Sequence, residues 1–69
     1  MTLFQLLSKI SLNIPLILFD INGAEITRVL SKSDVSIDLY EYEIFAIESI
    51  CEILIQGISK QALAITLIK

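Results

Sequence analysis

The hydrophobic positions at the start of the chain follow a helical period. Thr2 is a residue type that often caps helices. The apolar residues after it recur at intervals of three and four: Leu3, Leu6, Leu7 and Ile10. This spacing predicts a short amphipathic helix over residues 2–11. The helix must end before Pro15, because the proline ring cannot extend a helix and disfavours the α conformation in the residue before it.

The next two segments have the composition of strands joined by a tight turn. Apart from Asp20, residues 16–21 are apolar and rich in β-forming side chains, and residues 24–30 alternate between polar and apolar. Asn22-Gly23 between them tolerates the positive φ angles of a two-residue type I′ turn. This turn predicts a hairpin with three opposed pairs: Ile21 with Ala24, Phe19 with Ile26 and Ile17 with Arg28.

Residues 31–38 have the composition of a connecting loop, with three serines and three charged residues. They are expected to lead into the second half of a sheet. Ser33 is suited to capping a single helical turn within this loop.

Residues 42–58 fit two different structures. Five residues follow a heptad-like helical spacing: Ile44, Ile47, Cys51, Leu54 and Ile58. With a period of two, one strand face carries Phe45, Ile47, Cys51, Ile53 and Ile55, and the other carries Glu48, Glu52 and Gln56. The abundance of isoleucine, phenylalanine and tyrosine favours the strand over the helix. A turn over residues 57–61 then leads to a last strand over residues 62–68, whose shared face carries Leu63, Ile65 and Leu67.

These elements predict a single α+β domain over residues 1–69. One short N-terminal helix packs on an antiparallel sheet of two hairpins, and the alternative places a second helix at about 42–58. In both arrangements the N-terminal helix must cover an apolar sheet face. We therefore expect Leu6→Asp or Leu7→Asp to destabilise the protein by several kcal/mol in a thermal melt, because each would bury an unpaired charge.

The composition bears on how such a small domain is stabilised. A 69-residue chain buries only about 60% of the surface that its unfolded form exposes. Hydrophobic residues make up 55% of this chain, and 14 isoleucines and 11 leucines account for much of that share. The excess lies mostly in residues 42–68, where both faces are partly apolar. A lone small domain covers two such faces poorly, which indicates association.

The absence of histidine and the single cysteine exclude several kinds of chemistry. No imidazole can act as the base of a Ser-His-Asp or Cys-His site, and one thiol cannot supply a four-ligand zinc site. Cys51 cannot close an intramolecular disulfide, so we expect a buried apolar cysteine in a reducing, cytoplasmic compartment. Neither glycine lies in a phosphate-binding motif, and no cofactor is expected.

Nucleic acid and membrane are also unexpected partners. The net charge of −3 has the wrong sign for binding nucleic acid. The longest uncharged stretch of the N-terminal half, residues 10–19, is much shorter than the 18 or so apolar residues of a membrane-spanning helix.

Acidic and aromatic residues alternate just before the ambiguous segment: Asp38, Tyr40, Glu41, Tyr42 and Glu43. Converging carboxylates would suit a divalent metal or acid–base catalysis. No spacing of oxygen ligands typical of a calcium loop is present, so a solvated loop whose charges keep a sheet edge soluble is the better interpretation. As an exposed acidic and aromatic segment, it is also the candidate partner-binding site.

The order of the motifs resembles that of small accessory proteins encoded by phages and prophages of Gram-positive bacteria. The opening Thr2-Leu3-Phe4-Gln5-Leu6-Leu7 matches their T-L-x-x-L-L helix, and residues 14–20 with Asn22-Gly23 match their hairpin. Two later strand motifs correspond to Phe45-Ala46-Ile47-Glu48 and Leu63-Ala64-Ile65-Thr66-Leu67. The chain departs from the pattern at residues 50–61, which are longer and more apolar than the expected turn.

This resemblance implies a group that includes anti-CRISPR and other anti-defence inhibitors, which act mostly by stoichiometric binding. We therefore expect a non-catalytic protein-binding module, with a host protein as its partner and inhibition of a bacterial defence system such as CRISPR-Cas as its role. The alternative is a small structural protein that self-assembles into a homodimer or larger homo-oligomer.

Overall fold

Two β-hairpins supply the four strands of one sheet. In the first hairpin, β1 (Leu16–Phe19) pairs antiparallel with β2 (Glu25–Val29). In the second, β3 (Glu43–Ile55) pairs antiparallel with β4 (Ile58–Ile68). The computed structural model describes residues 1–11 and 13–68, and the side chains of residues 49–53 and 55 are outside this description.

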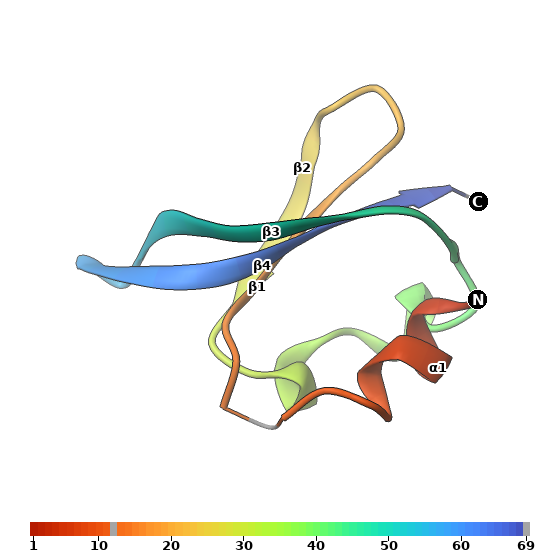
Figure 1. Ribbon diagram of the computed structural model, residues 1–69, viewed down its shortest axis with the longest axis horizontal. Coiled ribbons are helices and arrows are strands. Elements are labelled where there is room, and N and C mark those ends of the chain that lie inside the picture. Colours follow the sequence, from red (N-terminus) through yellow and green to blue (C-terminus); the bar gives the residue numbers. More distant parts are fainter. Residues whose placement is uncertain (12, 69) are drawn as a thin grey trace.

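The two hairpins join through their inner strands. β1 and β4 pair in parallel, with Leu16 beside Leu63 and Phe19 beside Thr66, which gives the strand order β2-β1-β4-β3 (Figure 1). The α+β class is confirmed, as are both hairpins. The sheet is mixed, however, whereas we predicted a purely antiparallel one. A parallel pair requires a long connection, and here that connection contains β2, a crossover segment and β3.

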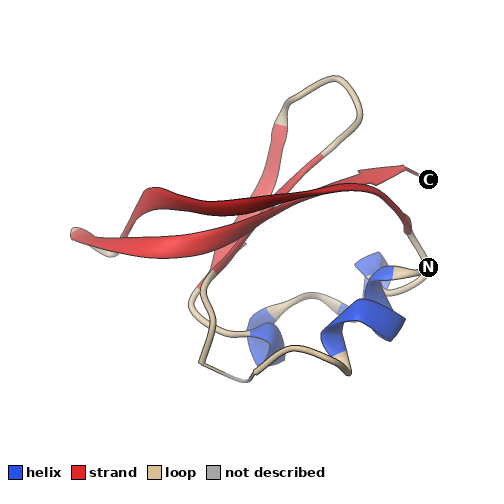
Figure 2. Cartoon of the chain, in the orientation of Figure 1, coloured by secondary structure: helices blue, strands red, loops and turns tan. Residues whose placement is uncertain are grey.

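Short helices cover one face of this sheet. They are α1 (Leu3–Leu7) and two 3₁₀ turns of the crossover, Lys32–Asp34 and Ile37–Leu39. All three lie on the same side of the sheet (Figure 2). The crossover passes from β2 at one edge to β3 at the other, so it and α1 form the second layer of the domain.

The N-terminal helix is shorter than the predicted 2–11. Thr2 caps it as expected, since its hydroxyl accepts from the Gln5 N–H (3.3 Å) while the Gln5 side chain accepts from the Thr2 N–H (2.9 Å). The helix ends at Leu7 with Ser8 as its C-cap, and the Lys9 N–H donates to the Leu6 carbonyl in a tighter turn. The predicted apolar stripe is confirmed: Leu3, Leu6 and Leu7 are buried, and Ile10 packs against them.

The first hairpin forms at the predicted place but with a different turn. The Asp20 N–H donates to Ala24, so three residues form the loop, and the Asp20 carboxylate accepts the N–H groups of Asn22 (2.9 Å) and Ala24 (3.0 Å). Gly23 has a φ of +86°, as the left-handed residue of such loops requires.

This loop changes the pairing of residues near the turn. Ile17 faces Arg28 as predicted, but a bulge after Leu18 places Phe19 opposite Glu25 instead of Ile26. Ile21 lies in the loop and has no strand partner. The predicted pairs at Ile21 and Phe19 are therefore wrong, because the side chain of Asp20 stabilises a three-residue loop in place of the two-residue turn.

The ambiguous segment is a strand, and the helical alternative for about 42–58 is wrong. β3 and β4 meet in a two-residue turn at Gln56 and Gly57, whose φ angles of +53° and +79° are those of a type I′ turn. The predicted turn over residues 57–61 is wrong as well, because β4 already begins at Ile58.

Two bulges interrupt β3, between Ile44 and Ala46 and between Glu48 and Cys51. Ile47 consequently faces Ile65, whereas Cys51 faces Ala62, and alternation along β4 puts Ile65 and Ala62 on opposite sides of the sheet. The single continuous face predicted from Phe45 to Ile55 is therefore not kept. The predicted burial of the Cys51 side chain lies outside the described residues.

The main core lies between the sheet and the helical layer. Leu3, Leu16, Leu18, Ile65 and Leu67 are almost completely buried there, and Val35 of the crossover completes it. The shared face predicted for Leu63, Ile65 and Leu67 is confirmed. A smaller cluster on the other face contains Ile17, Ala62 and Ala64.

The connection over residues 31–38 is more ordered than a simple loop. Its two 3₁₀ turns follow Ser31 and Ser36, and the Ser36 hydroxyl accepts from the Asp38 N–H (3.4 Å). Ser33, the predicted cap, lies inside the first turn instead, where its hydroxyl contacts that of Ser31 (2.8 Å).

Candidate protein-binding surface

The five predicted partner-binding residues have different environments. Asp38 and Glu41 are exposed at the end of the crossover. Tyr42 packs against the main core instead of facing solvent. The Glu43 carboxylate lies 3.2 Å from the Met1 amino group and forms an ion pair with it.

Hydrogen bonds explain why the second half of this segment is held in place. Main-chain groups of residues 1–4 bond to residues 40–44, with Leu3 donating to Tyr42 (2.8 Å) and Ile44 donating to Met1 (2.8 Å). Tyr42 and Glu43 thereby fasten the start of β3 to the N-terminal segment. Asp38 and Glu41 are left as the outward-facing part of the predicted site, and Tyr40 is half-buried and also packs against the main core.

The structure brings Phe4 and Ile37 to this segment. The Phe4 N–H donates to the Tyr40 carbonyl (3.1 Å), and the two aromatic rings lie 5.5 Å apart between centroids in a tilted arrangement. The Tyr40 N–H donates to the Ile37 carbonyl (3.1 Å). The second 3₁₀ turn thus links Ile37 to Tyr40 through the backbone, and the Phe4 ring contacts the Tyr40 ring.

We call Phe4, Ile37, Asp38, Tyr40 and Glu41 the crossover surface. Ile37 is 74% exposed and Phe4 is 57% exposed, although both are large apolar side chains. Sequence reasoning missed both residues. A signal for Phe4 was available, because it lies off the leucine stripe of the helix. For Ile37, the only sequence signal was its position in a polar segment.

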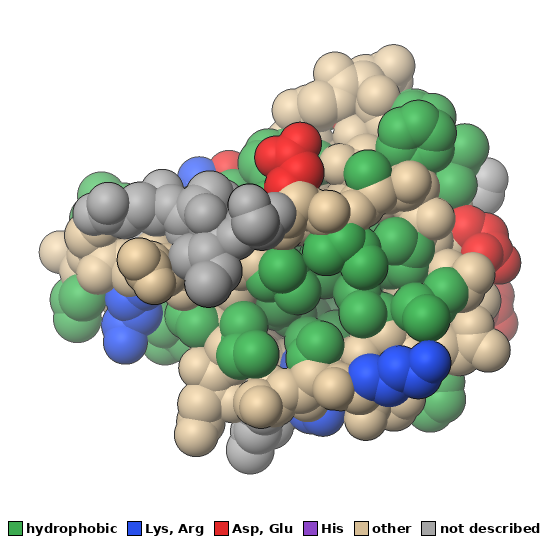
Figure 3. Space-filling model, viewed as in Figure 1, with side chains coloured by type: hydrophobic (Ala, Val, Ile, Leu, Met, Phe, Trp, Pro, Cys, Tyr) green, Lys and Arg blue, Asp and Glu red, His purple; other side chains and the backbone are tan. Residues whose placement is uncertain are grey.

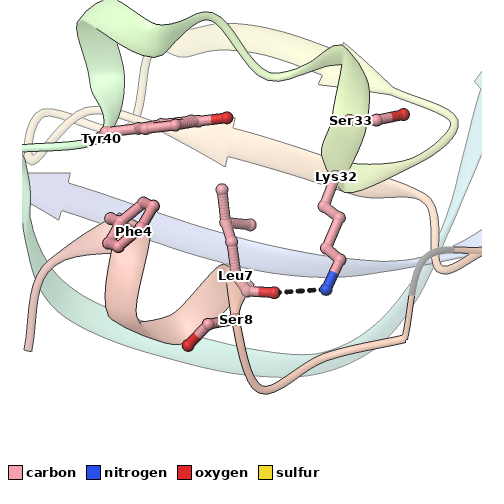
Figure 4. Close-up of a pocket in the computed structure, with 6 residues that line it drawn as sticks. All are labelled: Phe4, Leu7, Ser8, Lys32, Ser33 and Tyr40. Carbon is pink, nitrogen blue, oxygen red and sulfur yellow. Dashed lines mark hydrogen bonds between the residues drawn. The ribbon is translucent and has the colours of Figure 1, made fainter.

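A cavity of about 250 Å³ opens beside this surface, between α1 and the crossover. Its lining is mostly apolar, and the lining residues are Phe4, Leu7, Ser8, Lys32, Ser33 and Tyr40 (Figure 4). Phe4 and Leu7 extend from α1 toward Tyr40, which lies across from them, while Lys32 descends from the first 3₁₀ turn.

Lys32 connects the crossover to the end of α1. Its ammonium donates to the carbonyl oxygens of Leu7 (2.7 Å) and Ile10 (2.8 Å), and the group is partly buried. The last carbonyls of a helix have no partner within it and carry partial negative charge, so a lysine there is favourable. The contact also fixes one wall of the cavity.

The carboxylates of the predicted segment do not form a metal site. Within the described part of the chain, no group of three histidine, cysteine, aspartate or glutamate residues lies close enough to hold a metal ion. The clear electrostatic perturbation is elsewhere, at Glu25. Hydrogen bonding from Arg28, supported by its charge, lowers the pKa of this carboxyl below its ordinary value against a smaller effect of desolvation.

A second apolar region lies on the β3–β4 hairpin, whose tip extends beyond the helical layer (Figure 1). Five of its described side chains are large, apolar and exposed: Phe45, Ile47, Leu54, Ile58 and Ile68. Hydrophobic side chains also gather between β3 and the helical layer (Figure 3). Another cavity, of about 380 Å³, is lined by residues 13–15 and by residues 61–63 of β4.

Comparisons with known proteins add no relative to these observations. No family model, curated protein or solved structure matches the chain. The resemblance to phage accessory proteins therefore stays a prediction. Among the described residues, no helix is long and apolar enough to cross a membrane.

Proposed function

We propose that this protein acts by binding another protein through the crossover surface, without catalysis. The observation that carries this proposal is the exposure of Ile37 and Phe4 beside Asp38 and Glu41. Exposed apolar side chains that lie together and are bordered by charges are typical of protein-binding sites. The Phe4 and Tyr40 rings supply the kind of aromatic anchor that often dominates binding energy.

The surface is acidic as well as apolar. Residues 33–43 contain Asp34, Asp38, Glu41 and Glu43 and no lysine or arginine. Opposite charges across an interface accelerate association and discriminate between partners. A basic partner surface is therefore the complement that we propose. A host protein of a bacterial defence system, bound and inhibited by this chain in the cytoplasm, is the partner that the motif resemblance favours.

The experiment compares the wild type with the double variant Asp38→Lys/Glu41→Lys as bait in a bacterial lysate. The control is Glu48→Lys, because Glu48 is exposed on β3. Glu25 and Asp20 are not suitable control positions, because both carboxylates hold local structure. A partner retained by the wild type and by Glu48→Lys, and lost from the double variant, is the expected result. Equal retention by all three baits would contradict the proposal.

The hairpin supports a second candidate function, self-association. Leu54 and Ile58 are 60% and 57% exposed near the tip. In the described part of the chain, the outer edge of β3 forms strand pairs only near its start, with the N-terminal segment, and farther along the Leu54 carbonyl accepts a hydrogen bond from Arg28 (2.9 Å). An edge strand of this kind can add a strand from a second molecule.

Sedimentation separates this candidate from the first. Self-association through the hairpin predicts a dimer whose formation Leu54→Lys weakens and Ile37→Lys leaves unchanged. Partner binding through the crossover surface predicts that, in the lysate experiment, Ile37→Lys loses the partner and Leu54→Lys keeps it. A monomer at all concentrations, for the wild type, would reject self-association.

A further inference from the structure

We infer that the cavity between α1 and the crossover receives one apolar side chain of a basic segment in the partner. This inference rests on the proposed function and names the chemistry of the partner. The volume supports a single side chain, because about 250 Å³ is smaller than the roughly 300–1,000 Å³ of sites for drug-sized ligands and cofactors. Phe4, Leu7 and Tyr40 provide apolar walls for it.

The charges around the cavity favour a cationic segment. Asp34 directly follows the lining residue Ser33, Glu41 directly follows Tyr40, and both are exposed; the exposed Lys9 directly follows Ser8. Carboxylates therefore outnumber cations among the exposed charged residues next to the lining in the chain. The one cationic lining residue, Lys32, already faces two carbonyl oxygens at the end of α1. Lysines or arginines beside an apolar anchor would therefore meet more negative than positive charge next to the lining.

Lys32 also provides a polar contact for the bound segment. An ammonium group has three N–H donors, and two of them bond to Leu7 and Ile10. The third can donate to a main-chain carbonyl of the partner. This contact would orient the segment without requiring an anionic ligand.

Nuclear magnetic resonance with short peptides tests the inference directly. The probe is acetyl-Lys-Lys-Leu-Lys-Lys-amide, and its matched controls carry alanine in place of leucine or glutamate in place of all lysines. Benzoate serves as a small apolar anion. We expect saturable shifts of the Phe4, Leu7, Ser33 and Tyr40 amides with the leucine peptide, and binding about tenfold weaker for the alanine peptide because buried carbon atoms are lost.

Three outcomes would overturn the inference. Equal affinity of the leucine and alanine peptides would show that no side chain is buried. Tighter binding of benzoate or of the glutamate peptide would make the cavity an anion site of Lys32. Shifts confined to the β3–β4 hairpin, or no binding of any peptide, would place the contact elsewhere.

A variant that fills the cavity separates this inference from the proposed function. Ser33→Phe, on an exposed lining residue, adds a side chain there while all carboxylates remain, and Ser11→Phe is the matched control outside the cavity. In the lysate experiment, we expect Ser33→Phe to lose the partner and Ser11→Phe to keep it. If Ser33→Phe keeps a partner that Asp38→Lys/Glu41→Lys loses, the anchor is wrong and the proposed function stands.

Discussion

The two halves of β4 have different surroundings, and two of its isoleucines show this directly. Residues 58–61 are exposed and mostly polar, whereas Ile65 and Leu67 are buried. Ile58 and Ile65 are chemically identical, yet Ile58 is 57% exposed and Ile65 is fully buried. Alternation along β4 places Ile65 on the face that the helical layer covers (Figure 2), whereas Ile58 lies near the hairpin tip on the opposite face. Burial in this protein therefore depends on the face and the position that a residue has in the sheet, and not on hydropathy alone.

This contrast predicts that the same substitution, isoleucine to aspartate, changes the free energy of unfolding strongly at Ile65 and very little at Ile58. Ile65→Asp should place an unpaired charge in the main core and cost about 3–5 kcal/mol, much of the roughly 3–10 kcal/mol expected for a domain of this size. Ile58→Asp should change the free energy of unfolding by no more than about 0.5 kcal/mol. Urea unfolding followed by circular dichroism measures both. Equal losses would mean that the tip is covered in solution.

Substitution of Lys32 tests whether its hydrogen bonds to the end of α1 hold the helical layer together. Lys32→Met removes the donor to Leu7 and Ile10 and should destabilise the protein by about 1–3 kcal/mol, because two carbonyls lose their partner. Lys60→Met, on the exposed half of β4, is the matched control and should have an effect within about 0.5 kcal/mol. Chemical unfolding of the two variants distinguishes them, and similar values would show that Lys32 does not fasten the layer.

The cap at Thr2 is expected to have a smaller effect on the same layer. Thr2→Ala removes the hydroxyl that accepts from Gln5 and should cost about 1 kcal/mol. Thr2→Ser keeps the hydroxyl and should stay close to the wild type. A thermal melt of both variants checks this, and a loss with Thr2→Ser as large as that with Thr2→Ala would point away from capping.

The smallest expected effect concerns Arg28 of β2, which donates a hydrogen bond to the Leu54 carbonyl near the hairpin tip (2.9 Å). Arg28 also holds the Glu25 pKa below its ordinary value of 4.5. A lowered pKa stabilises the folded state at pH values above the ordinary pKa. This stabilisation is lost as the pH falls through the lowered pKa of the folded state. The carboxyl resonance of Glu25 should thus titrate below 4.5 in the wild type and close to it in Arg28→Gln. The same midpoint in both proteins would contradict the assignment.

Local features of the fold were predictable because they depend on neighbouring residues. The Thr2 cap, the leucine stripe of α1, the hairpin at Asn22-Gly23 and the inward face of β4 all leave periodic or turn signals. The parallel pairing of β1 with β4 leaves none, since it depends on residues as distant as Leu16 and Leu63. The bulges of β3 and the left-handed Gln56 also have no distinctive local pattern.

The candidate site was predictable in part for the same reason. Asp38, Tyr40 and Glu41 form a continuous acidic and aromatic segment that the sequence displays directly. Phe4 joins it only through a main-chain hydrogen bond and a ring contact with Tyr40. The Lys32 wall of the cavity likewise depends on a contact with Leu7 across the layer.

The position of β4 has a consequence for how the chain reaches its native state. β4 lies in the interior of the sheet and is the last of the four strands to leave the ribosome. Until it is made, β1 and β3 lack their shared neighbour, and the leucines of α1 have no complete surface to cover. Folding is therefore dominated by non-local contacts, which makes it slow for the size of the chain. During synthesis, the growing chain presents its isoleucines and leucines to the cell's chaperones.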